Sequence, residues 1–316
     1  PIIFYSILKK QFRRLDKNLL FAISLVLYFS PYLRSSAVWA TNDNLGLLFF
    51  VLSLSKLLTF TKKKDNSLKD IFLSFFYLII ATYIRQYYII IAVGYVVLLF
   101  TKIDIKTFFY IVIFNFFLLI PWILYSYNYL QFNSEYALKG FAKPDLIFSV
   151  LVFFTMYFFY ILPFFFQSEN YTKIKKLYNN KKIFFFIITI IYFLFFLYYD
   201  LPQNEYGGGI IYKISQLFDS KLFFMFLSYI GALLILLTIN LNFKNFFILF
   251  LLCLMFPFAT IYQKYYDPLI IIIFFGMIES NLIFDNISLK KINIVFIFTY
   301  FIIFLTSANI YYSAIL

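Results

Sequence analysis

Residues 30–50 have the sequence SPYLRSSAVWATNDNLGLLFF, a short polar segment between two apolar runs. The first apolar run ends at Pro31, and the second begins at Leu45. Between them lie Arg34, Trp39, Asn42, Asp43 and Asn44, in a chain that otherwise carries little charge. Polar groups at the mouth of a bundle of membrane helices form either a turn between spans or part of a site. We predict that these groups belong to a site.

The composition of the chain indicates a membrane protein. Its 316 residues are 64% hydrophobic and 25% aromatic, and only 13% are charged. No soluble core needs that much apolar surface. The apolar runs are continuous, as in Ile183–Leu197 and Ile292–Leu305, whereas the strands of a membrane barrel would alternate apolar and polar residues. We therefore predict an all-α polytopic transmembrane bundle, a single transmembrane domain over residues 1–316 with no sizeable soluble domain.

Basic residues set the expected orientation of the spans. The net charge is +13, but most of the 27 Lys and Arg lie in short connections between apolar runs, as the positive-inside rule requires. Nucleic acid is therefore not an expected partner. The predicted single spans are Leu19–Leu33, Leu45–Phe60, Phe108–Tyr127, Leu146–Phe166, Ile183–Tyr199, Leu222–Ile239, Phe246–Ala259, Leu269–Phe284 and Ile292–Tyr312. The opening residues, PIIFYSIL, look like the tail of a membrane helix, so we expect an earlier span and outer loop upstream of Pro1.

Residues 71–100 form a longer apolar segment that Arg85 and Gln86 interrupt. Basic residues flank both ends, which predicts two short helices that meet at Arg85 with the tip of the hairpin toward the outer half of the bilayer. An Arg at membrane depth costs at least a few kcal/mol, so it normally has a partner and a purpose. Its forked guanidinium suits two oxygens of a phosphate or a carboxylate. The alternative is a salt bridge inside the bundle.

The other outer polar groups also have structural alternatives. Arg34 can lie at the level of the lipid headgroups, and Asn42 with Asp43 can cap a helix. Gly207–Gly209 can form a flexible loop, while Trp39 and the Tyr residues near span ends are typical of an interfacial belt. What these groups share is the predicted side of the membrane, and this favours a pocket that faces the outer leaflet.

The arrangement resembles the GT-C superfamily of membrane glycosyltransferases. Thr41–Phe50 is similar to that family's acidic or amide residue at the beginning of a helix after an outer loop. Ala81–Gln86 followed by Tyr87–Phe100 is similar to its pattern of a short helix, a basic residue and another short helix. Ile84–Gln86 is also similar to a motif of the dolichyl-phosphoglucose-dependent glucosyltransferases. Ile261–Pro268 is similar to the aromatic, basic and Pro element that opens a late helix.

This resemblance implies transfer of a sugar from a polyprenyl-phosphate-linked donor to a glycan or lipid-linked acceptor, on the extracytoplasmic face and in contact with membrane lipid. It implies Asp43 and Arg85 as catalytic residues, with Arg85 on the donor phosphate. The expected substrate-binding residues are Arg34, Asn42, Gln86, Glu205, Tyr262 and Lys264. The family's main catalytic carboxylate usually follows the first helix, which here would lie upstream of Pro1. We expect a bacterial inner membrane, with the site facing the periplasm or the exterior.

Metal chemistry and transport remain open at this point. The chain has no His and one Cys, Cys253, which excludes a His/Cys metal site but leaves a carboxylate site for a hard cation such as Mg²⁺. A transporter or flippase for a lipid-linked or anionic substrate would also use broken helices and a buried Arg. The absence of an evident internal repeat weighs against it.

Overall fold

A computed structural model gives the fold of the chain. It describes residues 1–13, 15–38, 41–62, 68–100, 103–132, 145–165, 171–202, 207–256, 261–280 and 291–315. Within these ranges nearly every residue is helical and none lies in a strand, so the prediction of an all-α bundle is confirmed. By contacts, the chain divides into two compact units, one of residues 1–24 with 33–144 and one of residues 25–32 with 145–316.

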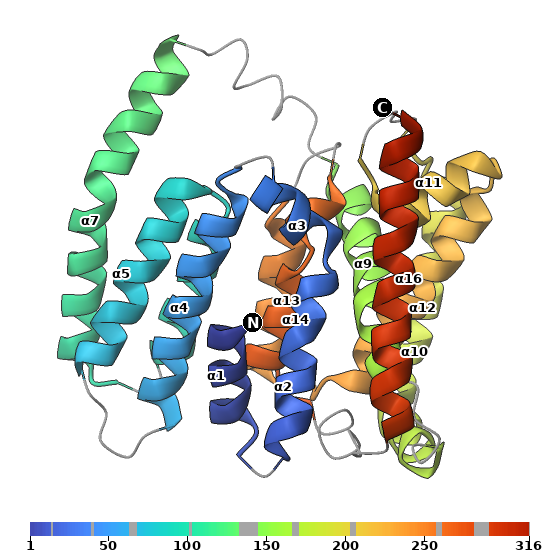
Figure 1. Cartoon of the computed structure of the whole chain (residues 1–316), viewed down its shortest axis with the longest axis horizontal. Helices are drawn as coiled ribbons and strands as arrows, with labels where there is room; N and C mark the ends of the chain where they lie inside the picture. Colours follow the sequence, from blue (N-terminus) through green and yellow to red (C-terminus); the bar gives the residue numbers. More distant parts are fainter. Residues whose placement is uncertain are drawn as a thin grey trace. The chain divides into compact units, whose positions relative to one another are not determined.

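The helices of the chain are shown in Figure 1. The earlier ones are α1 (Ile2–Gln11), α2 (Lys17–Leu25), the 3₁₀ turn η1 (Val26–Phe29), α3 (Pro31–Val38), α4 (Asp43–Lys62), α5 (Leu68–Ile84), α6 (Tyr88–Phe100) and α7 (Ile105–Phe132). The later ones are α9 (Leu146–Phe165), α10 (Tyr171–Tyr198), α11 (Gly209–Leu217), α12 (Lys221–Thr238), α13 (Phe243–Leu254), the 3₁₀ turn η3 (Gln263–Tyr265), α14 (Leu269–Gly276) and α16 (Lys291–Ile315).

Five of the described helices, α4, α7, α9, α10 and α12, are long and apolar enough to cross a membrane. Counting α2 to α3 as one broken span, bent by 58°, raises the number to six. A helix of 20 residues such as α4 is about 30 Å long at 1.5 Å per residue, which matches the hydrocarbon thickness of a bilayer.

The first unit is built on the antiparallel pair α4 and α5, which lie side by side (Figure 1). Halfway along the pair, Ser53 Oγ donates to the carbonyl of Ser74 at 2.7 Å, and Ser74 Oγ donates to the carbonyl of Ser53 at 2.9 Å. Small hydroxyl side chains permit this close approach, and their reciprocal hydrogen bonds satisfy groups that lipid would leave unpaired. The helix α6 folds back so that the ring of Tyr95 meets that of Phe75 at 5.9 Å.

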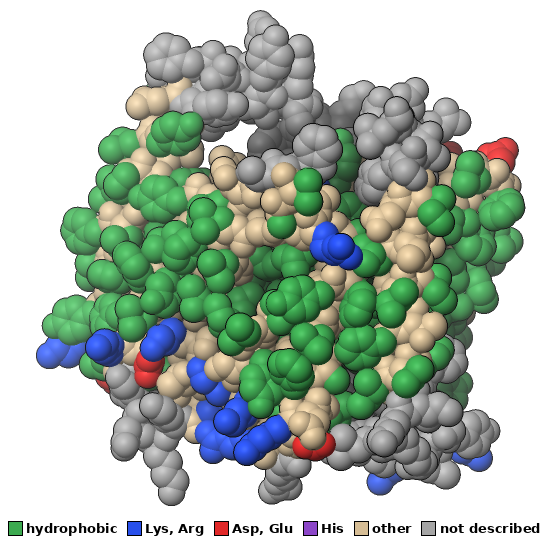
Figure 2. Space-filling model, in the orientation of Figure 1, with side chains coloured by type: hydrophobic (Ala, Val, Ile, Leu, Met, Phe, Trp, Pro, Cys, Tyr) green, Lys and Arg blue, Asp and Glu red, His purple; other side chains and the backbone are tan. Residues whose placement is uncertain are grey.

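Basic side chains gather at one end of the first unit. Figure 2 shows Lys and Arg over the lower ends of its helices, below a broad apolar surface. Lys62 ends α4 and Lys69 lies in the first turn of α5, so the antiparallel pair brings them to the same end. Lys10, near the end of α1, donates to the hydroxyls of Ser55 and Thr59 on α4 at 2.8 and 2.7 Å. Asp43, the first residue of α4, lies at the opposite end of the α4–α5 pair.

The second unit has α9 at its centre, with α12 running parallel to it and α10 antiparallel to α12. The helices α9 and α12 touch at Gly231, where an added Cβ would lie 2.0 Å from the carbonyl oxygen of Phe154. Only glycine permits this backbone contact. Beside it, Ser228 Oγ donates to the carbonyl of Leu151 at 3.0 Å and is paired with the hydroxyl of Tyr192 at 2.7 Å.

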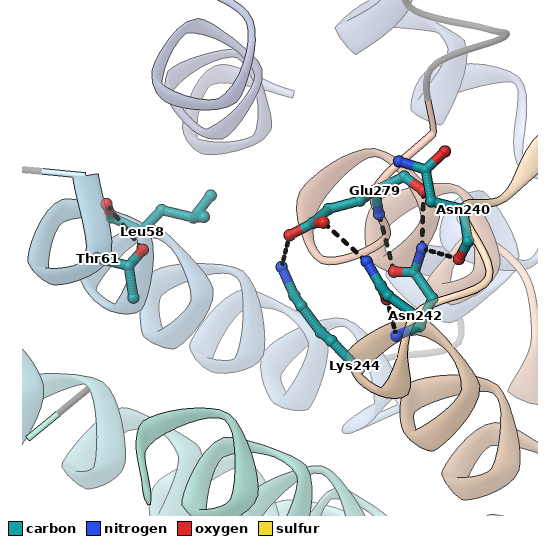
Figure 3. Close-up of polar contacts among 7 residues, drawn as sticks. Leu58, Thr61, Asn240, Asn242, Lys244 and Glu279 are labelled. Atoms are coloured by element: carbon teal, nitrogen blue, oxygen red, sulfur yellow. Dashed lines mark hydrogen bonds and ion pairs between the residues drawn. The ribbon is translucent and has the colours of Figure 1, made fainter. Parts of the chain in front are cut away.

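A polar cluster joins the turn between α12 and α13 to the segment after α14 (Figure 3). Asn245 Nδ2 donates to the carbonyls of Asn240 and Glu279, both at 2.8 Å, and its Oδ1 accepts from the N–H of Glu279 at 2.9 Å. The Glu279 carboxylate also pairs with Lys244 at 2.9 Å and accepts from Asn242 Nδ2 at 3.0 Å. Because the three hydrogen bonds of Asn245 join backbone groups of Asn240 and Glu279, which belong to different segments, the cluster acts as a structural clasp.

The hairpin predicted over residues 71–100 is confirmed. The helix α5 ends at Ile84 and α6 begins at Tyr88, so the break falls on Arg85, Gln86 and Tyr87. The two helices have 17 and 13 residues, about 26 and 20 Å in length.

Elsewhere several predicted boundaries differ from the structure. Arg34, expected in a polar loop, lies in α3, because the span predicted over Leu19–Leu33 bends at Ser30 and continues as a helix. The polar connection expected after Tyr199 contains α11. Its apolar residues recur at helical spacing, but the Gly, Lys and Gln between them made the segment look like a loop. The span predicted over Leu269–Phe284 ends as a helix at Gly276, and all residues of α14 are buried. A helix that is apolar all round is a membrane span or part of a core, and the eight residues of α14, about 12 Å in length, are too few to cross a bilayer.

Candidate functional site

The first unit places Asp43 against Arg85. The Arg85 Nε lies 2.6 Å from Asp43 Oδ1. Asp43 is the first residue of α4, and Arg85 is the first residue after α5, so the antiparallel packing of the two helices brings these ends together. At 1.5 Å per residue, Asp43 lies about 28 Å along α4 from Lys62, at the end opposite the basic side chains.

The local sequence explains why the two ends meet closely. An added Cβ at Gly46 would lie 3.2 Å from Tyr88 Cε2 and 3.4 Å from Arg85 Cγ. One turn further along α4, the ring of Phe50 stacks on that of Tyr88 with centroids 5.3 Å apart. Gly46 therefore leaves room on α4 for the stem of Arg85 and the ring of Tyr88, which together fix the break between α5 and α6.

The Asp43–Arg85 pair differs from the other ion pair that links the same two helices. Lys56 Nζ lies 3.1 Å from Asp70 Oδ1 with the geometry of a hydrogen bond. The Asp43–Arg85 contact is shorter, yet within the described residues Nε of Arg85 has no hydrogen bond. The exposed fractions are close, 36% and 14% for Lys56 and Asp70 against 36% and 18% for Arg85 and Asp43. Burial therefore does not explain the difference, and the Asp43–Arg85 pair is a charge contact without directed bonding.

Three other predicted residues of the first unit lie at the same end. Asn42 and Gln86 adjoin Asp43 and Arg85 in the chain, and both are exposed. Arg34 is exposed on α3. That helix is held to the beginning of α4 by Asn44, whose Nδ2 donates to the carbonyl of Leu33 at 2.8 Å. Asn44 was predicted to belong to the site with the rest of the polar segment, but no catalytic or binding role was assigned to it.

The remaining predicted residues do not belong to this unit or are not described. Lys264 and Tyr262 lie in the second unit, where the Lys264 ammonium is 5.3 Å from the ring centroid of Tyr262 and 5.7 Å from that of Tyr265. Such cation–π contacts are typical of an exposed cation at a membrane interface. Glu205 and Trp39 lie outside the described residues.

The second unit holds a polar cluster within Ile261–Pro268, a segment in which only Tyr262 and Lys264 were predicted as site residues. Asp267 is buried, and its Oδ2 accepts from Ser30 Oγ at 2.7 Å. Gln263 is also buried, donates to the hydroxyl of Tyr160 at 3.0 Å and accepts from the N–H of Ile210 at 2.9 Å. Gln263 and Asp267 thus point inward, Gln263 toward α9 and the beginning of α11, while Tyr262 and Lys264 of the same segment are exposed.

Burial dominates the chemistry of Asp267. The residue lies in the connection between α13 and α14, outside every candidate span. Loss of hydration disfavours the carboxylate and raises the pKa of Asp267 to about 7, although the hydrogen bond from Ser30 opposes the rise. This carboxyl is therefore a proton-binding group near neutral pH.

The carboxylates do not form an evident metal site. Over the described ranges, no three residues among Asp, Glu, Cys and His lie together in a way that would hold an ion. Asp43 pairs with a cation from the protein itself, which neutralises the charge that a divalent ion would need.

The fold defines this protein as an integral, multi-pass, all-α membrane protein. The Asp43–Arg85 ion pair lies at one end of its first helical unit. Comparison of the chain with models of known families, with curated proteins and with solved structures finds no match. A functional assignment therefore depends on the residues of the chain and on their geometry.

Proposed function

We propose that this protein is a membrane glycosyltransferase of the GT-C type. It transfers a sugar from a polyprenyl-phosphate-linked donor to a lipid-linked or cell-envelope glycan acceptor on the extracytoplasmic face. The observation that carries the proposal is the Asp43–Arg85 pair, which stands at the break between α5 and α6. The pair lies opposite the basic end of its unit, and the positive-inside rule assigns such a basic end to the cytoplasm.

The proposed chemistry needs a cation for the leaving group and a base for the acceptor. In the transfer step, the acceptor oxygen bonds to the anomeric carbon of the sugar while the bond from that carbon to the phosphate oxygen breaks. The phosphate leaves with the electron pair, and its charge is stabilised by the guanidinium of Arg85. The acceptor hydroxyl gives its proton to a carboxylate. Asp43 orients that hydroxyl. It also acts as the base unless another carboxylate of the complete protein accepts the proton.

The exposed polar groups beside the pair complete the proposal. Asn42 and Gln86 adjoin the two charged residues and supply hydrogen bonds to sugar hydroxyls. Arg34, in the same unit, is a secondary candidate for the phosphate. The assignments of Lys264 to the phosphate and of Glu205 and Tyr262 to the sugar remain predictions from the sequence. We propose a bacterial inner membrane, with this end of the first unit facing the periplasm.

The test is transfer of a radiolabelled sugar from polyprenyl-phosphate sugars in membranes that contain the complete protein. We expect Arg85→Ala to abolish transfer, while the protein still inserts and elutes as a single species in detergent. Lys56→Ala removes the basic partner of the other α4–α5 ion pair and serves as the matched control. Its transfer should stay within about threefold of wild type, because a partly exposed ion pair away from the proposed site contributes about 1 kcal/mol or less to stability. Normal transfer by Arg85→Ala would reject the assignment.

Transport is the second candidate, and one observation favours it. Polar groups follow α4 along its length, from Asp43 through Ser53 to Lys56, and the α5–α6 hairpin is broken as in many transporters. Uptake of a labelled polyprenyl-phosphate lipid into proteoliposomes, without any transfer of sugar, would favour this reading. Ser53 and Ser74 bond to each other, which leaves them poorly suited to line a path.

A further inference from the structure

The two ion pairs between α4 and α5 differ in their geometry. They bridge the same helices at nearly equal exposure. Lys56 and Asp70 are joined by a directed hydrogen bond. Arg85 and Asp43 touch through Nε and Oδ1, but the buried Nε has no hydrogen bond among the described residues. A guanidinium normally binds a carboxylate through two parallel N–H···O bonds, and Asp43 does not use that geometry.

We propose that Asp43 is an internal competitor for the anion site of Arg85. Its carboxylate neutralises the guanidinium in the absence of ligand, and a phosphoryl group must displace it or bind beside it. Both cases oppose binding, because a carboxylate within a few Å of a phosphate is a like charge at close range. The inference deepens the proposed function, on whose assignment of Arg85 to a phosphate it rests.

The packing around the pair supports such an exchange. The Cγ of Arg85 and the ring of Tyr88 are held against Gly46, so the stem of the guanidinium stays in place when its partner changes. Nε is buried whereas the side chain as a whole is 36% exposed, so the exposed part lies away from Nε. Incoming oxygens therefore approach a cation whose position is fixed by packing and not by Asp43.

The change in anion affinity when Asp43 is removed distinguishes a competitor from a residue that positions Arg85. If Asp43 only held Arg85 in position, its removal would weaken anion binding. As a competitor, its removal tightens binding. A partly exposed ion pair contributes a factor of up to about five to an equilibrium. We therefore expect Asp43→Asn to bind a phosphoryl ligand up to about fivefold more tightly than wild type.

The experiment is calorimetric titration of the full chain in lipid nanodiscs with farnesyl phosphate, inorganic phosphate and farnesol. We expect tighter farnesyl phosphate binding by Asp43→Asn, no change in Asp70→Asn, and loss of binding in Arg85→Gln. Asp43→Ser, which also removes the carboxylate and suits the beginning of a helix, serves if the Asn variant does not fold. Equal or weaker binding by both Asp43 variants would overturn the inference and leave the proposed function standing.

The remaining outcomes separate the inference from the proposed function. If the variants behave as expected but no sugar is ever transferred, the competitor role stands and the transferase proposal fails. If Arg85→Gln binds farnesyl phosphate as tightly as wild type, the phosphate assignment fails, and with it the inference. If inorganic phosphate binds as tightly as farnesyl phosphate with the same ranking of variants, the anion site stands and the lipid-linked class of ligand is overturned.

Discussion

Substitution of Gly46 tests whether packing on α4 fixes the cation of the site. A Cβ at this position would lie 3.2 Å from Tyr88 Cε2 and 3.4 Å from Arg85 Cγ, so alanine fits if the ring of Tyr88 yields by a few tenths of an ångström. Alanine gains up to about 1 kcal/mol of helix propensity, which offsets the tight contact. Valine adds two methyl groups that have no room, and overpacking of this kind costs about 1–3 kcal/mol.

We therefore expect Gly46→Ala to be nearly neutral and Gly46→Val to lose about 2 kcal/mol of unfolding free energy. Because Arg85 must move, transfer by Gly46→Val should fall by at least tenfold, since a displacement of about 1 Å can cost about a hundredfold. The assays are thermal unfolding in detergent and radiolabelled sugar transfer. Leu48→Val, at an exposed position of α4, controls for the helix propensity of valine. Unchanged transfer and unfolding in Gly46→Val would refute this account of the packing.

Three further predictions concern the second unit. Gly231→Ala must separate α12 from the carbonyl of Phe154, so its thermal unfolding midpoint should fall by several degrees, more than that of Gly46→Ala. Because the folded state raises the pKa of Asp267 to about 7, unfolding releases its proton, and stability should be highest below about pH 4 and fall as the pH rises through 7. The thermal unfolding midpoint of wild type should therefore be lower at pH 8 than at pH 5, whereas Asp267→Asn should show a smaller difference. An equal difference between the two pH values in both proteins would contradict the raised pKa. Asn245→Ala leaves the carbonyls of Asn240 and Glu279 and the N–H of Glu279 unpaired, so we expect a loss of about 2–3 kcal/mol of unfolding free energy. A loss of less than about 0.5 kcal/mol would exclude the clasp.

The sequence predicted the fold class, the break at Arg85 and the beginning of α4 because all three depend on strong local signals. Long apolar runs predict membrane helices, and a lone Arg within such a run predicts a break, as found at Arg85. The polar segment before Leu45 likewise predicted that α4 begins near Asp43. These signals require no knowledge of which helices are neighbours.

The contacts between distant residues were not predictable in the same way. That Asp43 pairs with Arg85 follows from the antiparallel register of α4 and α5, which side-chain packing sets. The inward orientation of Gln263 and Asp267 depends on Ser30 and Tyr160, which lie far away in the chain. The local sequence does not show that Gln263 and Asp267 are buried while Tyr262 and Lys264 are exposed, because tertiary packing decides it. An isolated glycine in a helix normally has a packing reason, and Gly46 was a usable sign of the close contact.

The most direct measurement is the activity of a charge-swapped variant, Asp43→Arg with Arg85→Asp. The exchange keeps an ion pair between α4 and α5 but moves the cation from the hairpin to the beginning of α4, where the helix dipole costs only about 0.3–1 kcal/mol. The account predicts an unfolding midpoint close to that of wild type and no transfer of labelled sugar from a polyprenyl-phosphate donor. Transfer restored to the wild-type rate would show that the pair serves structure alone, and would contradict the assignment of Arg85 to the donor phosphate.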